Sequence, residues 1–330
     1  MHELITAKDD AFSLNDKAEV LWQQTSIAKL CAGPTVLQPG LELLVEPAEE
    51  QIKQRLAAWV QMQMAERLKP LLLLRDKIDT DALDPATMVL GVRLLAALGA
   101  IDRRQIAKEL KELSQEQRAG LRDCGVRFGE FSLFMPHLLR PAAARLLALL
   151  LAFGPKGNGK PFFAPPGLTS FAVDGEHLTA VLSAVGLRKC GNRLIRLDML
   201  ERVGVEIRNA KQQAGQTSFQ PTLEMVALLG CSKPDLALIL TSLGYQRHET
   251  VTMEADEIDE LASSWVNRPP KTKTAKSAKP AVKRKPKPPN HKTSPTNQKK
   301  IDPDSPFAVL QSLKQNDGVA IAPKSRTKHV

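Results

Sequence analysis

The segment from Leu121 to Leu151 constrains the fold more than any other part of this 330-residue chain. Its first half, Gly125 to Phe134, is interrupted by glycine and carries three phenylalanines. This pattern breaks helical periodicity and predicts an irregular or short-strand crossover. The second half, Pro141 to Phe153, is apolar almost throughout. We therefore expect a helix that is buried on nearly all sides, at the centre of the first domain.

The residues around this segment predict two structural units. Residues 1–46 show short alternating apolar and polar runs between turn-forming residues, which predicts a small β unit. Residues 47–153 repeat apolar side chains every three or four positions, which predicts a helical domain. Its expected helices cover 48–76, 84–98, 102–113 and a short segment that opens with the capping box Ser114 to Gln117.

A loop rich in glycine and proline, residues 154–168, is expected to link this domain to a second one at 169–267. The second domain is expected to be α-rich with short strands. Two of its stretches align when Gly186 is matched with Gly244 and Asp198 with Asp256, and each predicts a helix, a glycine stop, a short strand and an Asp-capped helix. Duplication and chance similarity explain this match equally well.

Together these patterns predict a mainly α fold with short β elements and a disordered basic tail. Apolar residues make up 43% of the chain but aromatic residues only 4%, so the core must consist mainly of Leu, Ala, Val and Ile, which favour helices. Residues 268–300 are largely Lys, Pro, Thr and Ser, which predicts a disordered linker. In the final tail, 301–330, the spacing of Phe307, Leu310 and Leu313 predicts a short helix that docks a partner.

The positive charge of the chain is concentrated in this linker. Residues 268–300 hold twelve Lys and Arg and no Asp or Glu. The net charge of the chain is +10, so the remainder carries −2 once these twelve charges are removed. The linker can therefore bind nucleic-acid phosphates without sequence preference, or it can serve as a solubilising spacer; we favour the first. The candidate contacts there are Lys271, Lys273, Lys276, Lys279, Lys283, Arg284, Lys285 and Lys287.

Two places in the folded part are further candidates for nucleic-acid binding. Four cations, Arg188, Lys189, Arg193 and Arg196, fall on a predicted strand and turn, although a solvated edge strand would carry the same charges. The segment 221–248 has the pattern of a helix-turn-helix, but its second helix is almost wholly apolar, so packing explains it better than base recognition. Arg247 follows that helix and is kept as a candidate contact.

The segment Gly154 to Lys160 fits the GxxxxGK part of a phosphate-binding loop. The chemistry of that motif needs a preceding strand, a Ser or Thr after the lysine, and a following helix. Here a helix is expected before it, and Pro161 takes the place of the Ser or Thr. We therefore interpret this segment as a linker, and we expect no catalytic residue, no cofactor site and no metal site in the chain.

The spacing of the cysteines and the length of the apolar runs indicate the cellular compartment of the protein. Cys31, Cys124, Cys190 and Cys231 form no CxxC pattern, which favours free thiols in a reducing compartment. No apolar run reaches the ~20 residues that span a bilayer. The first residues lack the apolar stretch of a signal peptide. A cytoplasmic protein without a membrane partner is expected.

Ten short segments together resemble the C-terminal region of the alphaproteobacterial helicase-like proteins that are related to the RNA helicase of the mitochondrial degradosome. These segments are Ala18–Trp22, Ile27–Leu30 with Gly33 and Pro34, Leu71–Asp76, Leu98–Arg104, Gly125–Gly129, Leu138–Pro141, Gly167–Ser170, Asp198–Arg202, Leu228–Ser232 and Asp304–Ala308. In that family two RecA-like ATPase domains precede this region, and the whole acts as an ATP-dependent helicase of the second superfamily.

The resemblance implies an accessory region that contacts nucleic acid or partners and has no ATPase motifs of its own. Helicase activity would then arise only within a larger polypeptide or complex. The expected partners are RNA or another single-stranded nucleic acid, and a separate motor subunit. The chain is accordingly expected to be a fragment, one product of a split gene, or a stand-alone accessory. The alternative is a non-catalytic scaffold that docks a partner through its tethered C-terminal helix.

Overall fold

The computed structural model describes residues 2–46, 49–214, 217–252 and 258–268. These residues belong to one compact unit that extends from Met1 to Pro270. Apart from Arg268, the linker 268–300 lies outside the described residues, and so does the tail 301–330 with its expected short helix.

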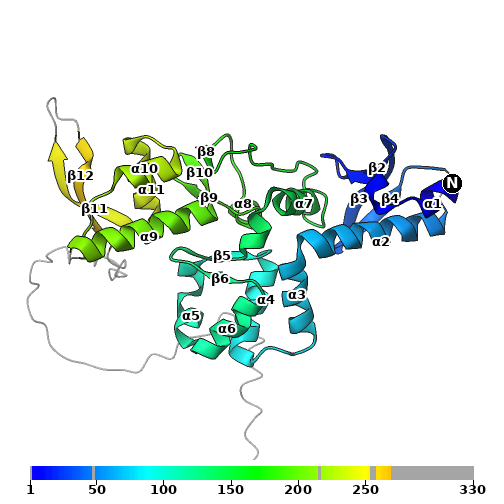
Figure 1. The fold of residues 1–330 in the computed structure, drawn as a ribbon, viewed down its shortest axis with the longest axis horizontal. Coiled ribbons are helices and arrows are strands. Elements are labelled where there is room, and N and C mark those ends of the chain that lie inside the picture. The colour runs from blue at the N-terminus through cyan, green and yellow to red at the C-terminus, as the bar shows by residue number, and fades with distance from the viewer. Residues whose placement is uncertain (1, 47–48, 215–216, 253–257, 269–330) are drawn as a thin grey trace, which may run out of the picture. The chain divides into compact units, whose positions relative to one another are not determined.

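A four-stranded antiparallel sheet lies in the stretch for which a small β unit is predicted (Figure 1). The turn between its second and third strands contains Gln23 and Gln24, both with positive φ (48° and 69°), as the tightest hairpin turns require. Val20, Ile27 and Leu30 of the sheet are buried in the same core as Ile52 of the first long helix. The strands are β1 (Phe12–Leu14), β2 (Glu19–Trp22), β3 (Thr25–Thr35) and β4 (Gln38–Leu43).

Within the described residues two short helices precede this sheet and six more follow it up to residue 123; several begin where capping residues predict. Asp84 accepts hydrogen bonds from the backbone N–H groups of Ala86 and Thr87, and Ser114 forms the complete capping box with Gln117. The helices are α1 (His2–Thr6), η1 (Asp9–Ala11), α2 (Glu50–Arg67), α3 (Lys69–Asp79), α4 (Pro85–Ala96), η2 (Arg103–Ile106), α5 (Ala107–Glu112) and α6 (Gln115–Asp123).

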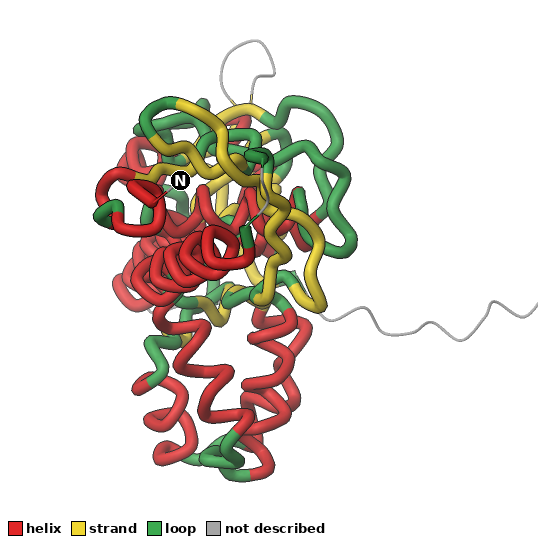
Figure 2. Tube along the Cα trace, turned by 90° about the vertical axis from the view of Figure 1, so that its right-hand side faces the viewer, coloured by secondary structure: helices red, strands yellow, loops and turns green. Residues whose placement is uncertain are grey.

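The single helix predicted over 48–76 is two helices, α2 and α3. Pro70 stands at the start of α3 and has no N–H to continue the hydrogen bonding of α2, so the chain breaks at Leu68. Helix α4 packs against α3, α5 and α6, and these helices form the lower part of the ribbon in Figure 1 and of the tube in Figure 2.

The predicted crossover contains a hairpin of β6 (Arg127–Phe128) and β7 (Ser132–Phe134), which together with β5 (Ala100–Asp102) forms an antiparallel sheet in the order β5-β7-β6. We call residues 127–134 the β6–β7 hairpin. After η3 (Pro136–Leu139) comes α7 (Pro141–Ala152), the expected buried helix. Its buried side chains include Leu146 and Leu147.

The second half contains the remaining elements: β8 (Ser170–Ala172), α8 (Thr179–Ala184), β9 (Leu187–Cys190), β10 (Arg193–Arg196), α9 (Leu197–Ala214), α10 (Leu223–Leu229), α11 (Lys233–Leu243), β11 (Tyr245–Thr252) and β12 (Ile258–Asn267). Strands β8, β10 and β9 form one antiparallel sheet, and β11 and β12 form another. No helix or strand lies between α7 and β8, where the linker 154–168 is predicted.

The prediction of a mainly α fold is wrong. Helices account for about 49% of the described residues and strands for 23%, arranged in several small antiparallel sheets. The Asp-capped helix expected from Asp256 is replaced by β12, whose Trp265 lies opposite Arg247 of β11. Short strands of this kind are stabilised by cross-strand and tertiary contacts, which local periodicity does not reveal.

Two large apolar cores lie on either side of the β6–β7 hairpin. Leu133 belongs to the first, which contains the N-terminal sheet, α2–α6 and most of α7. Phe131 and Phe134 belong to the second, which contains α9, α10 and α11. Alternate side chains of a strand point to opposite faces, so this one hairpin contributes to both cores.

No single helix in the described part of the chain is long and apolar enough to cross a membrane. Only α10 and α11 taken together reach the required hydropathy, and they are bent by 86°. Several of their large side chains, among them Leu236 and Leu240, are buried in the second core, whereas Leu223 and Leu238 are exposed.

Candidate nucleic-acid interface and adjoining polar junction

The structure pairs three of the four cations predicted on residues 188–196 with carboxylates. The guanidinium of Arg188 lies 2.7 Å from Asp102, and its side chain is only 13% exposed. Arg196 binds Asp198 through two hydrogen bonds of 2.7 and 2.8 Å, which raise the pKa of Arg196. Lys189 is exposed and pairs with no carboxylate of the described residues.

Arg193 connects three neighbouring elements. Its guanidinium donates to the hydroxyl of Ser170 at 2.9 Å and to the carbonyl of Gly230 at 3.1 Å, and it lies 3.7 Å from Asp235 of α11. These contacts account for the arginine at position 193, so no ligand is needed to explain it. Of the four predicted cations in this segment, Lys189 is therefore the one that the fold leaves open to an external phosphate.

Arg247 is held on β11 by its neighbours on β12. Its guanidinium donates to Glu260 at 2.6 Å and lies 5.2 Å from the ring centroid of Trp265. A hollow of about 500 Å³ lies beside these side chains. It is lined by Arg247, Glu260 and Trp265 together with Leu238 of α11 and the exposed Arg268. The Nε of Arg247 and the Nε1 of Trp265 are buried without a hydrogen-bond partner. Because these two atoms are inaccessible, they do not offer donors to a molecule in the hollow.

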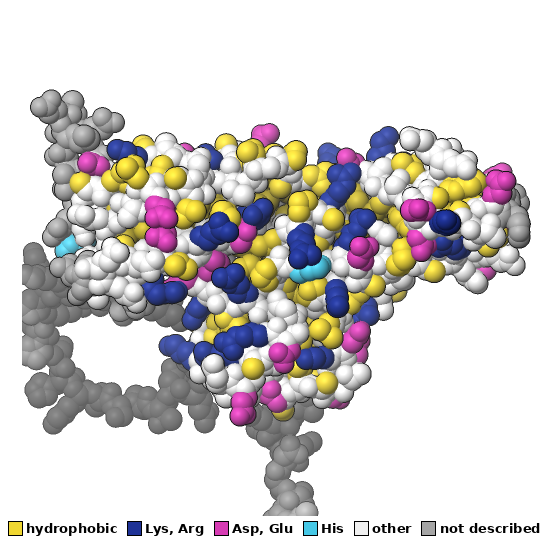
Figure 3. Space-filling view, viewed as in Figure 1, with side chains coloured by type: hydrophobic (Ala, Val, Ile, Leu, Met, Phe, Trp, Pro, Cys, Tyr) yellow, Lys and Arg dark blue, Asp and Glu magenta, His cyan; other side chains and the backbone are white. Residues whose placement is uncertain are grey.

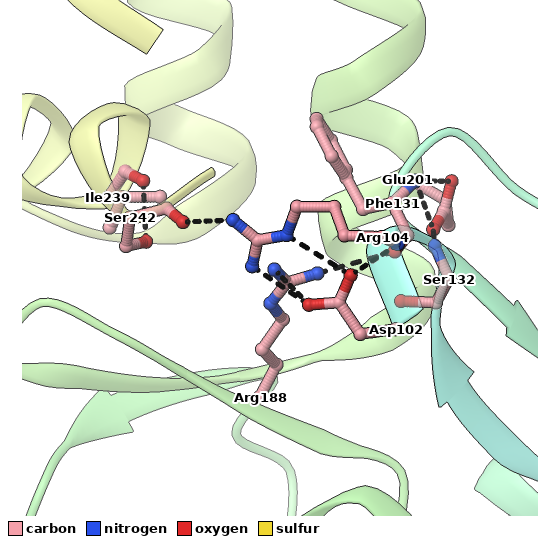
Figure 4. A network of polar contacts seen from close by, with 8 residues as sticks. All are labelled: Asp102, Arg104, Phe131, Ser132, Arg188, Glu201, Ile239 and Ser242. Carbon is pink, nitrogen blue, oxygen red and sulfur yellow. Dashed lines mark hydrogen bonds and ion pairs between the residues drawn. The ribbon is translucent and has the colours of Figure 1, made fainter. Parts of the chain in front are cut away.

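A polar junction joins β5, β9 and α11 (Figure 4). Asp102 accepts hydrogen bonds from the side chain of Arg104 at 2.8 and 3.2 Å and pairs with Arg188, while Arg104 also donates to the carbonyl of Ser242 at 3.4 Å. Burial raises the pKa of Asp102, but the hydrogen bonds from Arg104 and the charges of Arg188 and Arg104 outweigh burial, so the pKa is lowered overall.

A buried carboxylate, that of Glu201 on α9, holds the turn of the β6–β7 hairpin. It accepts backbone hydrogen bonds from Phe131 at 3.2 Å, from Ser132 at 2.9 Å and from Glu130. Burial raises the pKa of Glu201, and the three N–H groups oppose that effect only in part. A side chain at Gly129 would place its Cβ in steric overlap with the Glu201 carboxylate.

Sequence reasoning missed both Asp102 and Glu201 as organising residues. The available signal was indirect, because both lie in segments that carry the family resemblance, Leu98–Arg104 and Asp198–Arg202. Each is an acidic residue whose partners include residues far away in the sequence, so no local pattern identifies it.

The segment Gly154 to Lys160 lacks the surroundings of a phosphate-binding loop. Helix α7 precedes it, and the next helix along the chain is α8, which begins at Thr179. The N–H of Gly159 donates to the carbonyl of Ala152, so this donor is already used. This geometry offers no helix N-terminus to a phosphate.

The four cysteines are free thiols, and burial raises the pKa values of Cys124, Cys190 and Cys231. Within the described residues no group of three or more His, Cys, Asp and Glu is placed to hold a metal ion. The linker candidates, from Lys271 to Lys287, and the docking residues Phe307, Leu310 and Leu313 lie outside the described residues.

No family model, no curated protein and no solved structure matches this chain. The relationship implied by the ten short segments therefore stays a prediction.

Proposed function

We propose that this chain is a non-catalytic module that contacts single-stranded RNA through its basic linker and works beside a separate helicase motor. The observation that supports it is the distribution of charge. In the folded part, Arg188, Arg193, Arg196 and Arg247 all have carboxylate partners. Residues 268–300, by contrast, hold twelve cations and no acid. Such a run attracts phosphates by counterion release and needs no fixed geometry.

The motor partnership rests on the family resemblance. It is supported by the surroundings of Gly154 to Lys160, where the described residues supply neither the strand nor the helix that ATP binding would need. The proposal assigns the protein to the cytoplasm, and it attributes strand separation to the motor rather than to this chain.

The test is fluorescence anisotropy with a labelled uridine oligonucleotide, measured across a salt series. We compare the unaltered chain with a variant in which all twelve Lys and Arg of residues 268–300 are replaced by Gln. The variant should bind at least about ten-fold more weakly at low salt, and the slope of log K against log salt should fall by about 0.7 for each phosphate that the chain no longer neutralises.

The matched control is a chain in which residues 268–300 are scrambled with their composition kept. Because counterion release does not depend on sequence, this control should bind as the unaltered chain does. Equal binding by the Gln variant and the unaltered chain would refute the proposal, and so would ATP hydrolysis by the isolated chain.

A further inference from the structure

Three exposed arginines that were not among the predicted contacts lie on the β6–β7 hairpin or beside it. Arg103 follows β5, Arg122 lies in the last turn of α6, and Arg127 is on β6 itself. Strand β6 is at the edge of its sheet, because the strand order is β5-β7-β6. Figure 3 shows Lys and Arg side chains gathered over β5, β6 and α5 on this face.

Direct contacts hold two of these arginines against the hairpin. The guanidinium of Arg103 donates to the carbonyl of Gly129 at 2.6 Å. The guanidinium of Arg122 lies 5.4 Å from the ring centroid of Phe128, a half-buried aromatic residue. These two cations are therefore positioned by the fold and do not depend on long unsupported side chains.

Three carboxylates that contact the hairpin or the strand beside it are already engaged. Glu130 pairs with Arg208 at 2.6 Å, Asp102 with Arg104 and Arg188, and Glu201 with backbone N–H groups. Across the described part of the chain, no carboxylate pairs with Arg103, Arg122 or Arg127. Three positive charges are thus left available to an external anion.

We infer that Arg103, Arg122 and Arg127, which we call the hairpin arginines, form a second contact surface for the phosphates of single-stranded nucleic acid. This inference rests on the proposed function and deepens it, because it adds a fixed surface to the linker. Guanidinium groups bind phosphates through two parallel hydrogen bonds and stack on bases and aromatic rings. The use of arginine at all three positions favours nucleic acid over an acidic protein.

The experiment replaces the hairpin arginines with Gln, both in the otherwise unaltered chain and in the chain whose linker cations are already Gln. The probe is the same labelled uridine oligonucleotide. The matched control replaces three exposed lysines far away in the sequence, Lys8, Lys17 and Lys53, with Gln and removes the same charge. In the linker-neutral chain the arginine variant should bind at least about ten-fold more weakly, and the salt slope should fall by about 2.

Arg103 also bonds the hairpin, so a second variant, Arg122→Gln/Arg127→Gln, leaves that hydrogen bond intact and should show most of the same weakening. Binding that survives both variants, or that falls equally in the lysine control, overturns the inference. So does a linker-neutral chain that binds no oligonucleotide at all. If binding to poly-glutamate or anionic vesicles weakens to the same extent, the surface is a general anion site and the nucleic-acid assignment is wrong. If the proposed function itself is wrong, replacing the linker cations with Gln will leave oligonucleotide binding unchanged. That result is distinct from the outcomes above.

Discussion

Glu201 of α9 accepts a hydrogen bond of 2.9 Å from the backbone N–H of Ser132 on β7, although the two residues are 69 positions apart in the sequence. The same carboxylate binds the N–H groups of Glu130 and Phe131. One buried side chain thereby joins the long helix of the second core to the hairpin that also contributes to the first.

Replacing Glu201 with Gln should lower the free energy of unfolding by about 1–3 kcal/mol. The amide turns one acceptor oxygen into an NH₂ group that faces backbone donors, and those donors are then left buried without a partner. Chemical denaturation followed by circular dichroism measures the change. The control, Glu112→Gln at an exposed position, should stay within about 0.5 kcal/mol. Equal effects would mean that Glu201 does not hold the hairpin.

The pH dependence of the free energy of unfolding, compared between the unaltered chain and Glu201→Gln, tests the raised pKa of Glu201. A group whose pKa is higher in the folded state stabilises the fold fully below its unfolded pKa, and this contribution is lost as the pH rises through the folded pKa. The stability difference between the unaltered chain and Glu201→Gln should therefore grow as the pH falls from about 7 to about 4. A difference that shrinks over this range would show that the hydrogen bonds outweigh burial.

Gly129→Ala should destabilise the fold, because the new Cβ would overlap the carboxyl carbon of Glu201. The carboxylate cannot move away without giving up its backbone donors, so a loss of about 2 kcal/mol is expected. Gly120→Ala in α6 is the matched control. No atom outside its own helix lies within 4 Å of that Cβ, so alanine should stabilise the helix by up to about 1 kcal/mol. Thermal and denaturant unfolding should show opposite signs for the two variants.

Asp102→Asn should cost about 2–3 kcal/mol near neutral pH, because Arg188 is only 13% exposed and would be left without its carboxylate partner. The pKa of Asp102 is lowered in the fold, so its contribution is present above the unfolded pKa and disappears as the pH falls through the folded one. The cost of Asp102→Asn should therefore shrink under acid conditions. Asp76→Asn, whose partner Arg75 is at the surface, should change stability much less. An effect of Asp102→Asn that stays constant down to about pH 2 would contradict this assignment.

Lys160→Ala should leave nucleotide binding unchanged, because the segment around it has neither the strand nor the helix of a phosphate-binding loop. Isothermal titration of both chains with Mg²⁺-ATP checks this expectation, and neither chain should release heat of binding. Binding by the unaltered chain that Lys160→Ala removes would show that Gly154 to Lys160 is a nucleotide site.

Local signals in the sequence predicted many of the elements correctly. Asp84 and Ser114 cap the helices that their spacing predicts, and the apolar run from Pro141 is a buried helix. Each of these features depends on residues within one or two turns of one another. The break at Pro70 was also visible in the sequence, yet the periodicity on either side of it led to one helix instead of two.

The candidate site could be predicted only in part, because a cation in a sequence carries no sign of its partner. Arg188 and Lys189 are neighbours, but one is paired with Asp102 and the other is exposed. No local pattern in the sequence marks Arg122 and Arg127 as candidate contacts. Only the folded structure shows that Arg122 lies close to Phe128.

The sequence by itself determined the helix caps, the buried helix α7, the turn between β2 and β3 and the concentration of charge in residues 268–300, because each depends on composition or on near neighbours. Tertiary structure decided the pairing of β11 with β12, the burial of Glu201 and which arginines remain available for an anion. These features depend on residues that local periodicity does not connect, and their approach is set by the packing of the two cores and not by any local preference.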